Sequence, residues 1–381
     1  MTVAGIFCAD YHSLYKPYFY RQVNSFKSIA PVVCTWSKGE RKKSEAVIES
    51  MGCEWGLGRY PTLLRRFCAR VGWPLAGGTP VEHAATASLI DAHAMDVALA
   101  HTGFVADRIF EPVMSRNIPL VLYLHGGDLR EAKHSSGWRK RMRSMCLGAE
   151  KIVVVGNYMV DQVNDLGIDR SKISVIPVGA PVKNRVPVSD VGSDNHFVFV
   201  GRLVPCKAVD VIIQAVHLAR KAGVDIRLSI IGDGPLAPLL QKQVYALEIG
   251  DLVRFEGIQD SNFVNASLDQ NSGLVIHTVD EPGGPEAFGV VVTEAMAAAR
   301  PVITSRCGGL VDQIDDGVHG RVVEQRDAQA LSEAMIQLGA DQALRAAYGK
   351  SARQRAIEEF DAAFLGAKVE HMLIETARSK S

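Results

Sequence analysis

Short apolar runs alternate with longer amphipathic stretches along the whole chain. In the amino-terminal half the runs occupy residues 3–8, 32–36, 97–101, 120–125, 152–155 and 173–177. They are almost continuously apolar, whereas a strand with one face in water alternates apolar and polar positions. Their spacing leaves room for a helix between successive strands, so this half is predicted to form a parallel sheet covered by helices on both faces.

A second series of the same kind follows a segment without periodicity. Residues 181–195 are rich in proline, serine, asparagine, aspartate and glycine, which is typical of a linker. Apolar runs resume at 197–200, 226–231, 252–255, 274–277 and 302–304, and from residue 356 the pattern is helical. The sequence therefore predicts an α/β protein with two doubly wound, Rossmann-like domains that face a cleft, at 1–185 and 186–355, followed by a helix at 356–381.

Length, charge and cysteine content narrow the class of protein. The 381 residues exceed what a single hydrophobic core usually organises, and 47% of them are apolar. The net charge is zero, but residues 1–190 carry 24 basic and 17 acidic side chains, against 18 and 25 in the remainder. Seven scattered cysteines without a C-x-x-C pair argue against a disulfide framework and a zinc site. With neither a basic leader nor a long apolar stretch, the protein is expected to be cytoplasmic.

Two glutamates, Glu286 and Glu294, stand eight positions apart where a loop is predicted to meet a helix. Phe288-Gly289 can form the turn, and residues 290–299 are predicted to form a buried helix that ends before Pro301. The N–H groups at a helix start suit a phosphate, and flanking carboxylates accept hydrogen bonds from hydroxyls. The arrangement suits a sugar nucleotide, although two glutamates near a helix start can equally serve only to complement its dipole.

Two glycine-containing loops follow predicted strands in the second half. In the segment 201–207, GRLVPCK, Arg202 and Lys207 can converge on a diphosphate, the guanidinium as a bidentate donor and the ammonium as a point charge. The alternative is a solvated loop, since most lysines and arginines are exposed. The segment 232–235, GDGP, weakly matches the dinucleotide fingerprint, but Pro235 removes a donor where pyrophosphate would approach, so nicotinamide or flavin binding is not favoured.

Two histidines follow predicted strands in the first half, His101 and His125. His125 is the better functional candidate, because the glycines after it let the backbone approach a ligand and Asp128 can cap the next helix. A structural histidine is the commoner alternative. The two histidines lie on different loops without a cysteine or carboxylate cluster beside them, so no metal site is expected.

These motifs together resemble the retaining GT-B glycosyltransferases of family 4, also called glycosyl transferases group 1. The resemblance extends over the second domain and the linker and is thinner in the first domain. It rests on Glu286, Phe288-Gly289, Glu294-Ala295-Met296, Gly201-Arg202-Leu203 with Lys207, the segment 232–235 and the His-Gly-x-Asp at 125–128. Three residues depart from the family's pattern, namely Ala287, Arg300 and Asp312. These departures leave the donor's identity more open than the reaction class.

The resemblance implies a reaction and a role for each matching residue. A sugar would move, with retention of configuration, from a nucleotide-diphosphate donor to a hydroxyl acceptor without a cofactor or metal, and Arg202 and Lys207 would neutralise the departing diphosphate. The candidate binding residues are Glu294 for the ribose, the N–H groups of Phe288, Gly289, Val290 and Val291 for phosphate, Gly201 and Gly234 for the nucleotide side of the cleft, and Glu286, His125 and Gly127 for the donor sugar. The terminal helix would pack back on the first domain.

The sequence gives weaker indications of partners other than the donor. Tyr20 and Arg21 can contact the acceptor, or the aromatic side chains of this segment can pack in the core. Residues 138–143, WRKRMR, combine four cations with two apolar anchors, which suits either an anionic membrane surface on the cytoplasmic side or a solvated helix face.

The expected role is polysaccharide, glycolipid or other glycoconjugate assembly, without nucleic acid as a partner, because the overall charge is zero and no aromatic–basic module appears. Two alternatives remain open at this point. A sugar-nucleotide epimerase with the GT-B fold would use the same donor cleft, and a non-catalytic protein would bind the nucleotide sugar without turnover.

Overall fold

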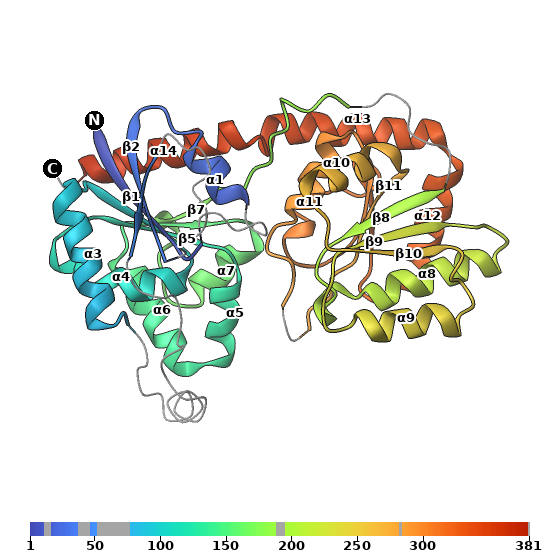
Figure 1. Ribbon diagram of the computed structural model, residues 1–381, viewed down its shortest axis with the longest axis horizontal. Coiled ribbons are helices and arrows are strands. Elements are labelled where there is room, and N and C mark those ends of the chain that lie inside the picture. Colours follow the sequence, from blue (N-terminus) through green and yellow to red (C-terminus); the bar gives the residue numbers. More distant parts are fainter. Residues whose placement is uncertain (11–16, 37–45, 52–76, 188–194, 282–283, 380–381) are drawn as a thin grey trace. The chain divides into compact units, whose positions relative to one another are not determined.

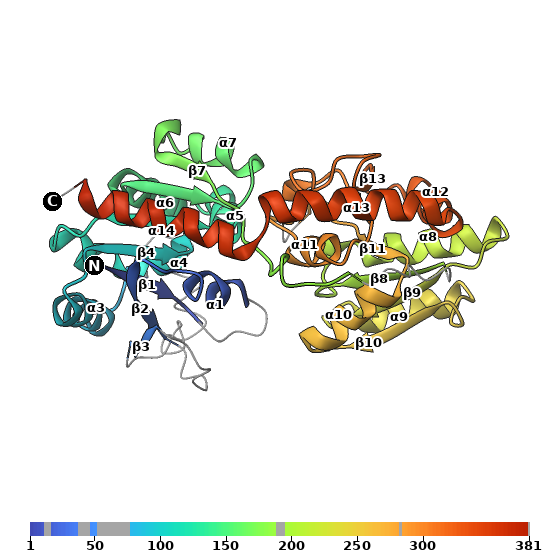
Figure 2. The same ribbon diagram turned by 90° about the horizontal axis from the view of Figure 1, so that it is seen from above.

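The computed structural model describes residues 1–10, 17–36, 46–51, 77–187, 195–281 and 284–379. They form two compact units, the first of residues 1–179 and 362–381 and the second of residues 180–361. Each unit contains a parallel sheet with helices on both faces (Figure 1, Figure 2). The predicted α/β class with two Rossmann-like domains is confirmed.

The first unit is built on a seven-stranded sheet in which all neighbouring strands are parallel. Its strands, in spatial order, are β3 (Val47–Ser50), β2 (Ile29–Thr35), β1 (Thr2–Cys8), β4 (Val97–His101), β5 (Leu120–Leu124), β6 (Lys151–Val154) and β7 (Ile173–Val175). The α-helices are α1 (Pro17–Val23), α3 (Pro80–His93), α4 (Gly103–Ser115), α5 (Gly127–His134), α6 (Ser136–Gly148), α7 (Tyr158–Asn164) and α14 (Ala362–Arg378). Every residue of β4 and β5 is buried, as continuously apolar central strands require.

The terminal helix α14 belongs to the first unit although the second unit precedes it in the chain. It packs against α1, β1 and β4 (Figure 2). Gly366 lies so close to Ser25 that a larger side chain would collide with it. The buried carboxylate of Glu370 accepts hydrogen bonds from the N–H groups of Lys27, Ser28 and Ile29. These contacts tie α14 to the connection between α1 and β2.

The second unit contains a six-stranded parallel sheet. The spatial order is β10 (Val253–Gly257), β9 (Arg227–Ile231), β8 (His196–Val200), β11 (Gly273–Ile276), β12 (Val302–Ser305) and β13 (Gly320–Val323). Helices α8 and α9 cover one face and α10 and α11 the other (Figure 1). The α-helices are α8 (Val209–Lys221), α9 (Ala237–Ala246), α10 (Ser261–Gln270), α11 (Val290–Ala297), α12 (Ala328–Ala340) and α13 (Gln342–Glu359), and the 3₁₀ turns include η3 (Pro205–Lys207) and η4 (Gly308–Leu310).

The sheet of the second unit has the 3-2-1-4-5-6 strand order of a dinucleotide-binding domain. The order reverses between β8 and β11, which are neighbours in the sheet. In such sheets ligands bind beyond the carboxyl ends of the strands at the point of reversal. The loops that follow β8 and β11 are therefore the ones positioned to form a site.

The chain passes between the units twice, and the two segments pair with each other. The N–H of Ala180 donates to the carbonyl of Phe360, and the N–H of Lys183 donates to the Asp361 carboxylate. The predicted linker at 181–195 begins beside this pair, and its residues 188–194 lie outside the described residues. Across the described ranges, five cysteines are free and buried, and no helix is long and apolar enough to cross a bilayer.

Candidate functional site

Lys207 and Glu286, which are 79 positions apart, form an ion pair in the second unit. Lys207 ends η3 in the loop after β8, and Glu286 lies in the loop between β11 and α11. The two loops meet because β8 and β11 are adjacent, and the N–H of Val279 donates to the Cys206 carbonyl at 3.0 Å. The sequence predicted that both residues bind the same donor, and the structure places them in direct contact.

The electrostatic surroundings of Lys207 are unusual for a lysine. Its side chain is 13% exposed, and burial, together with the positive charge of Arg202, lowers its pKa from 10.5 to about 8. The carboxylate of Glu286 acts in the opposite direction by stabilising the ammonium form. Arg202 is exposed and near enough to influence Lys207. Two cations and a carboxylate thus gather at the carboxyl end of β8, where an anionic ligand would be well compensated.

Glycines hold the cationic loop against the loop that follows β9. The N–H of Gly201 donates to the Ile231 carbonyl, and the N–H of Leu203 donates to the Asp233 carbonyl. A Cβ atom on Gly232 would lie 2.0 Å from the Gly201 oxygen, and one on Gly234 would lie 2.4 Å from the Leu203 oxygen. Gly201 and Gly234, predicted to line the nucleotide side, therefore have packing roles that fix the backbone next to Arg202.

A second glycine pair holds the backbone of Glu286. The N–H of Gly309, in η4, donates to the Glu286 carbonyl at 2.8 Å. A Cβ atom on Gly309 would lie 2.0 Å from the Ala287 oxygen, and one on Gly308 would lie 2.4 Å from the Glu286 oxygen. Gly308 also has a φ of +56°, which favours glycine. The η4 turn therefore fixes the height of Glu286 above the sheet.

Helix α11 begins at Val290, as predicted from sequence, with Gly289 as its N-cap residue. The buried Gln313 side chain pairs with both backbone groups of Gly289, accepting from its N–H at 2.8 Å and donating to its carbonyl at 3.1 Å. The N–H of Gly289 is thus engaged within the fold, which corrects its expected role as a phosphate donor. Within the described part of the chain, the N–H groups of Val290 and Val291 make no hydrogen bond.

The side chain of Phe288 has a structural position. It is 6% exposed and packs edge-on against Phe360, with 5.7 Å between the ring centroids. Its N–H, like those of Val290 and Val291, makes no hydrogen bond among the described residues. The main chain of Phe288 therefore remains a candidate for phosphate binding while its ring anchors the turn.

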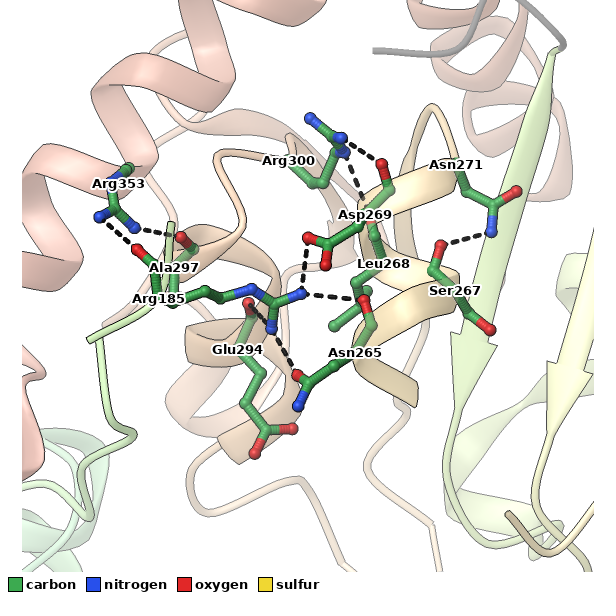
Figure 3. A network of polar contacts seen from close by, with 10 residues as sticks. All are labelled: Arg185, Asn265, Ser267, Leu268, Asp269, Asn271, Glu294, Ala297, Arg300 and Arg353. Atoms are coloured by element: carbon green, nitrogen blue, oxygen red, sulfur yellow. Dashed lines mark hydrogen bonds and ion pairs between the residues drawn. The ribbon is translucent and has the colours of Figure 1, made fainter. Parts of the chain in front are cut away.

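Glu294 lies in the second turn of α11, and arginines bind the carbonyls near it (Figure 3). Arg185 donates to the Glu294 carbonyl, to Asn265 and to the Asp269 carboxylate. Arg353 donates to the Ala297 carbonyl and to that of Arg185. Figure 3 shows the Glu294 carboxylate pointing away from the Arg185 guanidinium. The cations thus complement the carboxyl-terminal end of α11 and leave the carboxylate to face elsewhere.

Arg300 is fully buried at the end of the connection from α11 to β12. Its guanidinium donates to the carbonyls of Leu268 and Asp269 in the last turn of α10 (Figure 3). Glycine is common at this position in the family that the sequence resembles, and the sequence alone left the departure without a reason. The structure supplies one, since Arg300 satisfies the terminal carbonyls of a neighbouring helix.

His277, which immediately follows β11, is a site-adjacent residue that the sequence did not indicate. Its Nε2 accepts a hydrogen bond from the Arg326 N–H at 2.9 Å, and the ring is fully buried. Burial, reinforced by the positive charge of Arg326, lowers its pKa from 6.5 to about 4. A neutral His277 therefore links the ends of β11 and β13 at physiological pH.

In the first unit, His125 lies just after β5 and Gly127 begins α5. The N-cap residue of α5 is Gly126, whose φ of +98° requires glycine. The buried Asp128 accepts hydrogen bonds from the N–H groups of Gly126 and Leu129 and also from that of Gly103. Asp128 was expected to cap the next helix. It does bind N–H groups at the start of α5, and it also joins the loop after β5 to the start of α4.

Two aromatic residues of α1, Tyr18 and Phe19, contact His125. Tyr18 stacks on His125 with 5.3 Å between centroids, and Phe19 contacts it edge-on at 5.6 Å. Tyr20 is half-buried, and Arg21 lines a small pocket with residues of α14 and the segment after β7. Burial raises the pKa of the Tyr18 hydroxyl, and the nearby negative charge of Asp128 adds to this rise. Tyr18 and Phe19 are residues that sequence reasoning passed over.

The basic segment at 138–143 lies in α6, and its two apolar residues face inward. Trp138 is 5% exposed and Met142 is fully buried. Their expected role as membrane anchors is therefore wrong, because both pack in the core of the first unit. Arg141 stacks over Trp138 and pairs with Asp107, whereas the remaining cations of the segment are exposed: Arg139, Lys140 and Arg143.

Potential metal ligands do not cluster among the described residues, where no group of three or more histidine, cysteine, aspartate or glutamate side chains is placed to hold an ion. His101 and His125 nevertheless lie close together, with 3.2 Å between Nδ1 of His101 and Nε2 of His125. The sequence assigned them to separate loops and gave no sign of this contact. It arises because β4 and β5 are neighbours in the sheet.

Sequence comparison divides the chain between two family models. The model described as Glycosyltransferase Family 4 matches residues 31–183, and that described as Glycosyl transferases group 1 matches residues 183–355. An uncharacterized glycosyltransferase of Methanocaldococcus jannaschii is 26% identical over 70% of this chain and 72% of its own length. A GDP-mannose-dependent phosphatidylinositol monomannoside mannosyltransferase of Mycolicibacterium smegmatis is 26% identical over 63% of this chain and 68% of its own length.

Solved structures share the fold over nearly the whole chain. HepE of Anabaena, solved in complex with UDP and glucose, superposes with a TM-score of 0.77 over 98% of this chain and 100% of its own, at 16% identity. Sucrose-phosphate synthase of Thermosynechococcus elongatus gives a TM-score of 0.80 over 100% of both chains, also at 16% identity. The two family models together match residues 31–355. The chain therefore belongs to the GT-B glycosyltransferases of family 4, enzymes that take a glycosyl group from a nucleotide sugar.

Proposed function

We propose that this enzyme transfers a sugar, with retention of configuration, from a nucleotide-diphosphate sugar to a hydroxyl of a saccharide or lipid-linked saccharide. The observation that carries the proposal is the Lys207–Glu286 ion pair beyond the carboxyl ends of β8 and β11. A cation and a carboxylate meet there beside Arg202 and the start of α11. A ligand with a diphosphate and a polyol matches this arrangement of charges and donors.

In this proposal different residues of the second unit bind different parts of the donor. Arg202 and Lys207 bind the diphosphate and stabilise the charge that develops as it leaves. The N–H groups of Phe288, Val290 and Val291 add donors at the positive end of α11. Glu286 accepts hydrogen bonds from the sugar hydroxyls, and Glu294 does so from the ribose.

Catalysis by these groups is electrostatic. A nucleoside diphosphate needs little protonation to depart, so two fixed cations in a partly buried site lower the barrier without proton transfer. The proposed reaction therefore uses neither a metal nor an organic cofactor, since Arg202 and Lys207 supply the compensating charge. Donor-dependent turnover in the presence of excess EDTA is expected to equal that in its absence.

The first unit contributes His125 and Gly127 in this proposal. His125 contacts the donor sugar, which is the role that the family resemblance gives it. Tyr20 and Arg21 are proposed acceptor contacts. Gly127 leaves room near the backbone, because a Cβ atom there would meet only the Arg130 side chain, at 3.7 Å.

Donor binding is the first test. Thermal unfolding is measured with UDP, GDP and ADP, because a ligand that binds only the folded state raises the apparent stability by about 2.7 kcal/mol at 100 times its dissociation constant. One nucleotide is expected to raise the melting temperature far more than the others. Absence of a shift with all three nucleotides at millimolar concentration would contradict the proposed donor site.

Substitution of the ion pair is the second test. Lys207→Ala and Glu286→Gln are each expected to reduce turnover by roughly 10²–10³-fold, the usual cost of one charge-stabilising group. The matched control is the exposed ion pair of Arg220, in the last turn of α8, and Asp251, just before β10, which lies at the amino ends of the strands, away from the site. Arg220→Ala and Asp251→Asn should retain full turnover. Near-normal rates in both site variants would refute the assignment, and proton NMR of the anomeric centre tests retention.

We also propose that the enzyme works at the cytoplasmic face of a membrane in polysaccharide or glycolipid assembly. Support comes from the exposed cations of α6, which are Arg139, Lys140 and Arg143. Each cation near an anionic surface contributes about 1 kcal/mol. Sedimentation with phosphatidylglycerol vesicles should weaken with salt and in the triple alanine variant. Equal sedimentation with neutral and anionic vesicles would rule the attraction out.

A further inference from the structure

A buried histidine lies behind the candidate sugar-binding histidine of the first unit. His101 ends β4 and is 1% exposed, whereas His125 follows β5 and is partly exposed. Nδ1 of His101 lies 3.2 Å from Nε2 of His125. At that distance the two nitrogens share one hydrogen, so one ring donates and the other accepts.

Aromatic rings hold both imidazoles in place. His101 packs between Phe19 and Tyr123, with centroids 4.5 Å and 5.2 Å away. His125 stacks on Tyr123 at 4.8 Å and on Tyr18 at 5.3 Å. Tyr123 itself is anchored, because its hydroxyl donates to the Ile176 carbonyl at 2.7 Å. The ring planes are therefore fixed, and the position of the shared hydrogen is the remaining variable.

That hydrogen decides what His125 offers to a ligand. A neutral imidazole carries one N–H, so if Nε2 of His125 accepts from His101, its Nδ1 must carry the hydrogen and act as a donor. If Nε2 donates instead, Nδ1 is an acceptor. A sugar hydroxyl can satisfy either form, but its orientation differs between them.

We propose that His101 is a positioning residue that fixes the tautomer of His125 for contact with the donor sugar. The contact between the two rings and the burial of His101 between aromatic rings are the observations that carry this inference. The inference rests on the proposed function, in which His125 contacts that sugar. His101 itself, being almost fully buried, acts only through His125.

The experiment compares two substitutions with complementary losses. His101→Phe keeps a ring between Phe19 and Tyr123 but removes the nitrogen that faces His125. His101→Asn loses the stacking but restores a polar atom near the position of Nδ1. Release of nucleotide from UDP-glucose and from GDP-mannose is expected to fall by about 10-fold to 100-fold in the Phe variant, as for other residues that orient a reacting group. The Asn variant should recover most of the loss.

A double-substitution cycle separates positioning from a general structural effect. On a His125→Ala background, His101→Phe should cost no further activity, since it would have nothing left to orient. An equal loss on both backgrounds would overturn the inference while leaving the proposed function intact. A fully active His125→Ala variant would instead remove the proposed role of His125, and the inference with it.

A spectroscopic readout makes the inference testable without turnover. In protein labelled with ¹⁵N-histidine, His125 should show the nitrogen shifts of a single neutral tautomer, assigned by comparison with His125→Ala. The Phe variant should shift these signals towards a mixture of tautomers, and the Asn variant should restore them. The thermal transition shows whether the Phe variant is folded. If it is folded and its His125 nitrogen shifts are unchanged, the proposal is wrong.

Discussion

Substitution of Gly309 by alanine tests how the fold positions Glu286. The added Cβ atom would lie 2.0 Å from the Ala287 oxygen, and contacts under 3.0 Å force a shift. The obstacle is backbone, so the segment 286–287 or η4 must move by at least about 1 Å. A displacement of that size near reacting groups can cost about 10²-fold in rate. The hydrogen bond from the Gly309 N–H to the Glu286 carbonyl would also be strained.

The expected result is therefore a loss of about 10²-fold in turnover with a moderate loss of stability, about 1–3 kcal/mol for overpacking. Steady-state kinetics with the nucleotide sugar found by the binding screen measures the first, and urea unfolding measures the second. The matched control is Gly250→Ala, where the added Cβ atom meets nothing within 4 Å. Normal turnover in a folded Gly309→Ala variant would refute the view that η4 sets the position of Glu286.

Three further predictions concern the second unit. Since burial lowers the pKa of Lys207 to about 8, kcat/KM of the free enzyme should fall above that pH. A kcat/KM that does not change up to pH 9.5 would contradict this. The unfolded chain holds that proton up to about pH 10.5, so this group makes stability rise with pH between 8 and 10.5. Arg300→Met removes the donors of one buried and one partly buried carbonyl and should cost about 2–5 kcal/mol in urea unfolding, with unchanged nucleotide specificity. Gln313→Leu removes the bonds to both backbone groups of Gly289, and should weaken nucleotide binding in a calorimetric titration; equal affinity would contradict a supporting role.

The architecture could be predicted because the central strands of both sheets are almost continuously apolar and are separated by βα spacing. Strand β4 was placed at its observed bounds, and the start of α11 was correct to the residue. Strand β3, Val47–Ser50, was missed because its residues are partly exposed at the edge of the sheet and carry little apolar signal. An edge strand has one neighbour and needs less apolar surface than a central one.

Part of the site in the second unit could also be predicted from the positions of the strands. Lys207 and Glu286 each follow a strand, and strands adjacent in a doubly wound sheet bring such residues together. The direction in which side chains point could not be predicted in this way. Trp138 and Met142 carry the composition of a surface anchor, but their spacing of four positions places both on one face of α6, and that face is the buried one.

Arg300 illustrates how a departure from a family motif can mislead when it is interpreted by position alone. It is one of three departures that, from the sequence alone, leave the donor's identity more open than the reaction class. Its guanidinium instead reaches the end of α10, where the Leu268 and Asp269 carbonyls have no further helical turn to bond. Glycine at this position supplies no donors, so a chain with glycine here must satisfy those carbonyls in another way. The contacts of Arg300 therefore explain how α10 ends, and this explanation rests on its hydrogen-bond partners and not on its position in the sequence.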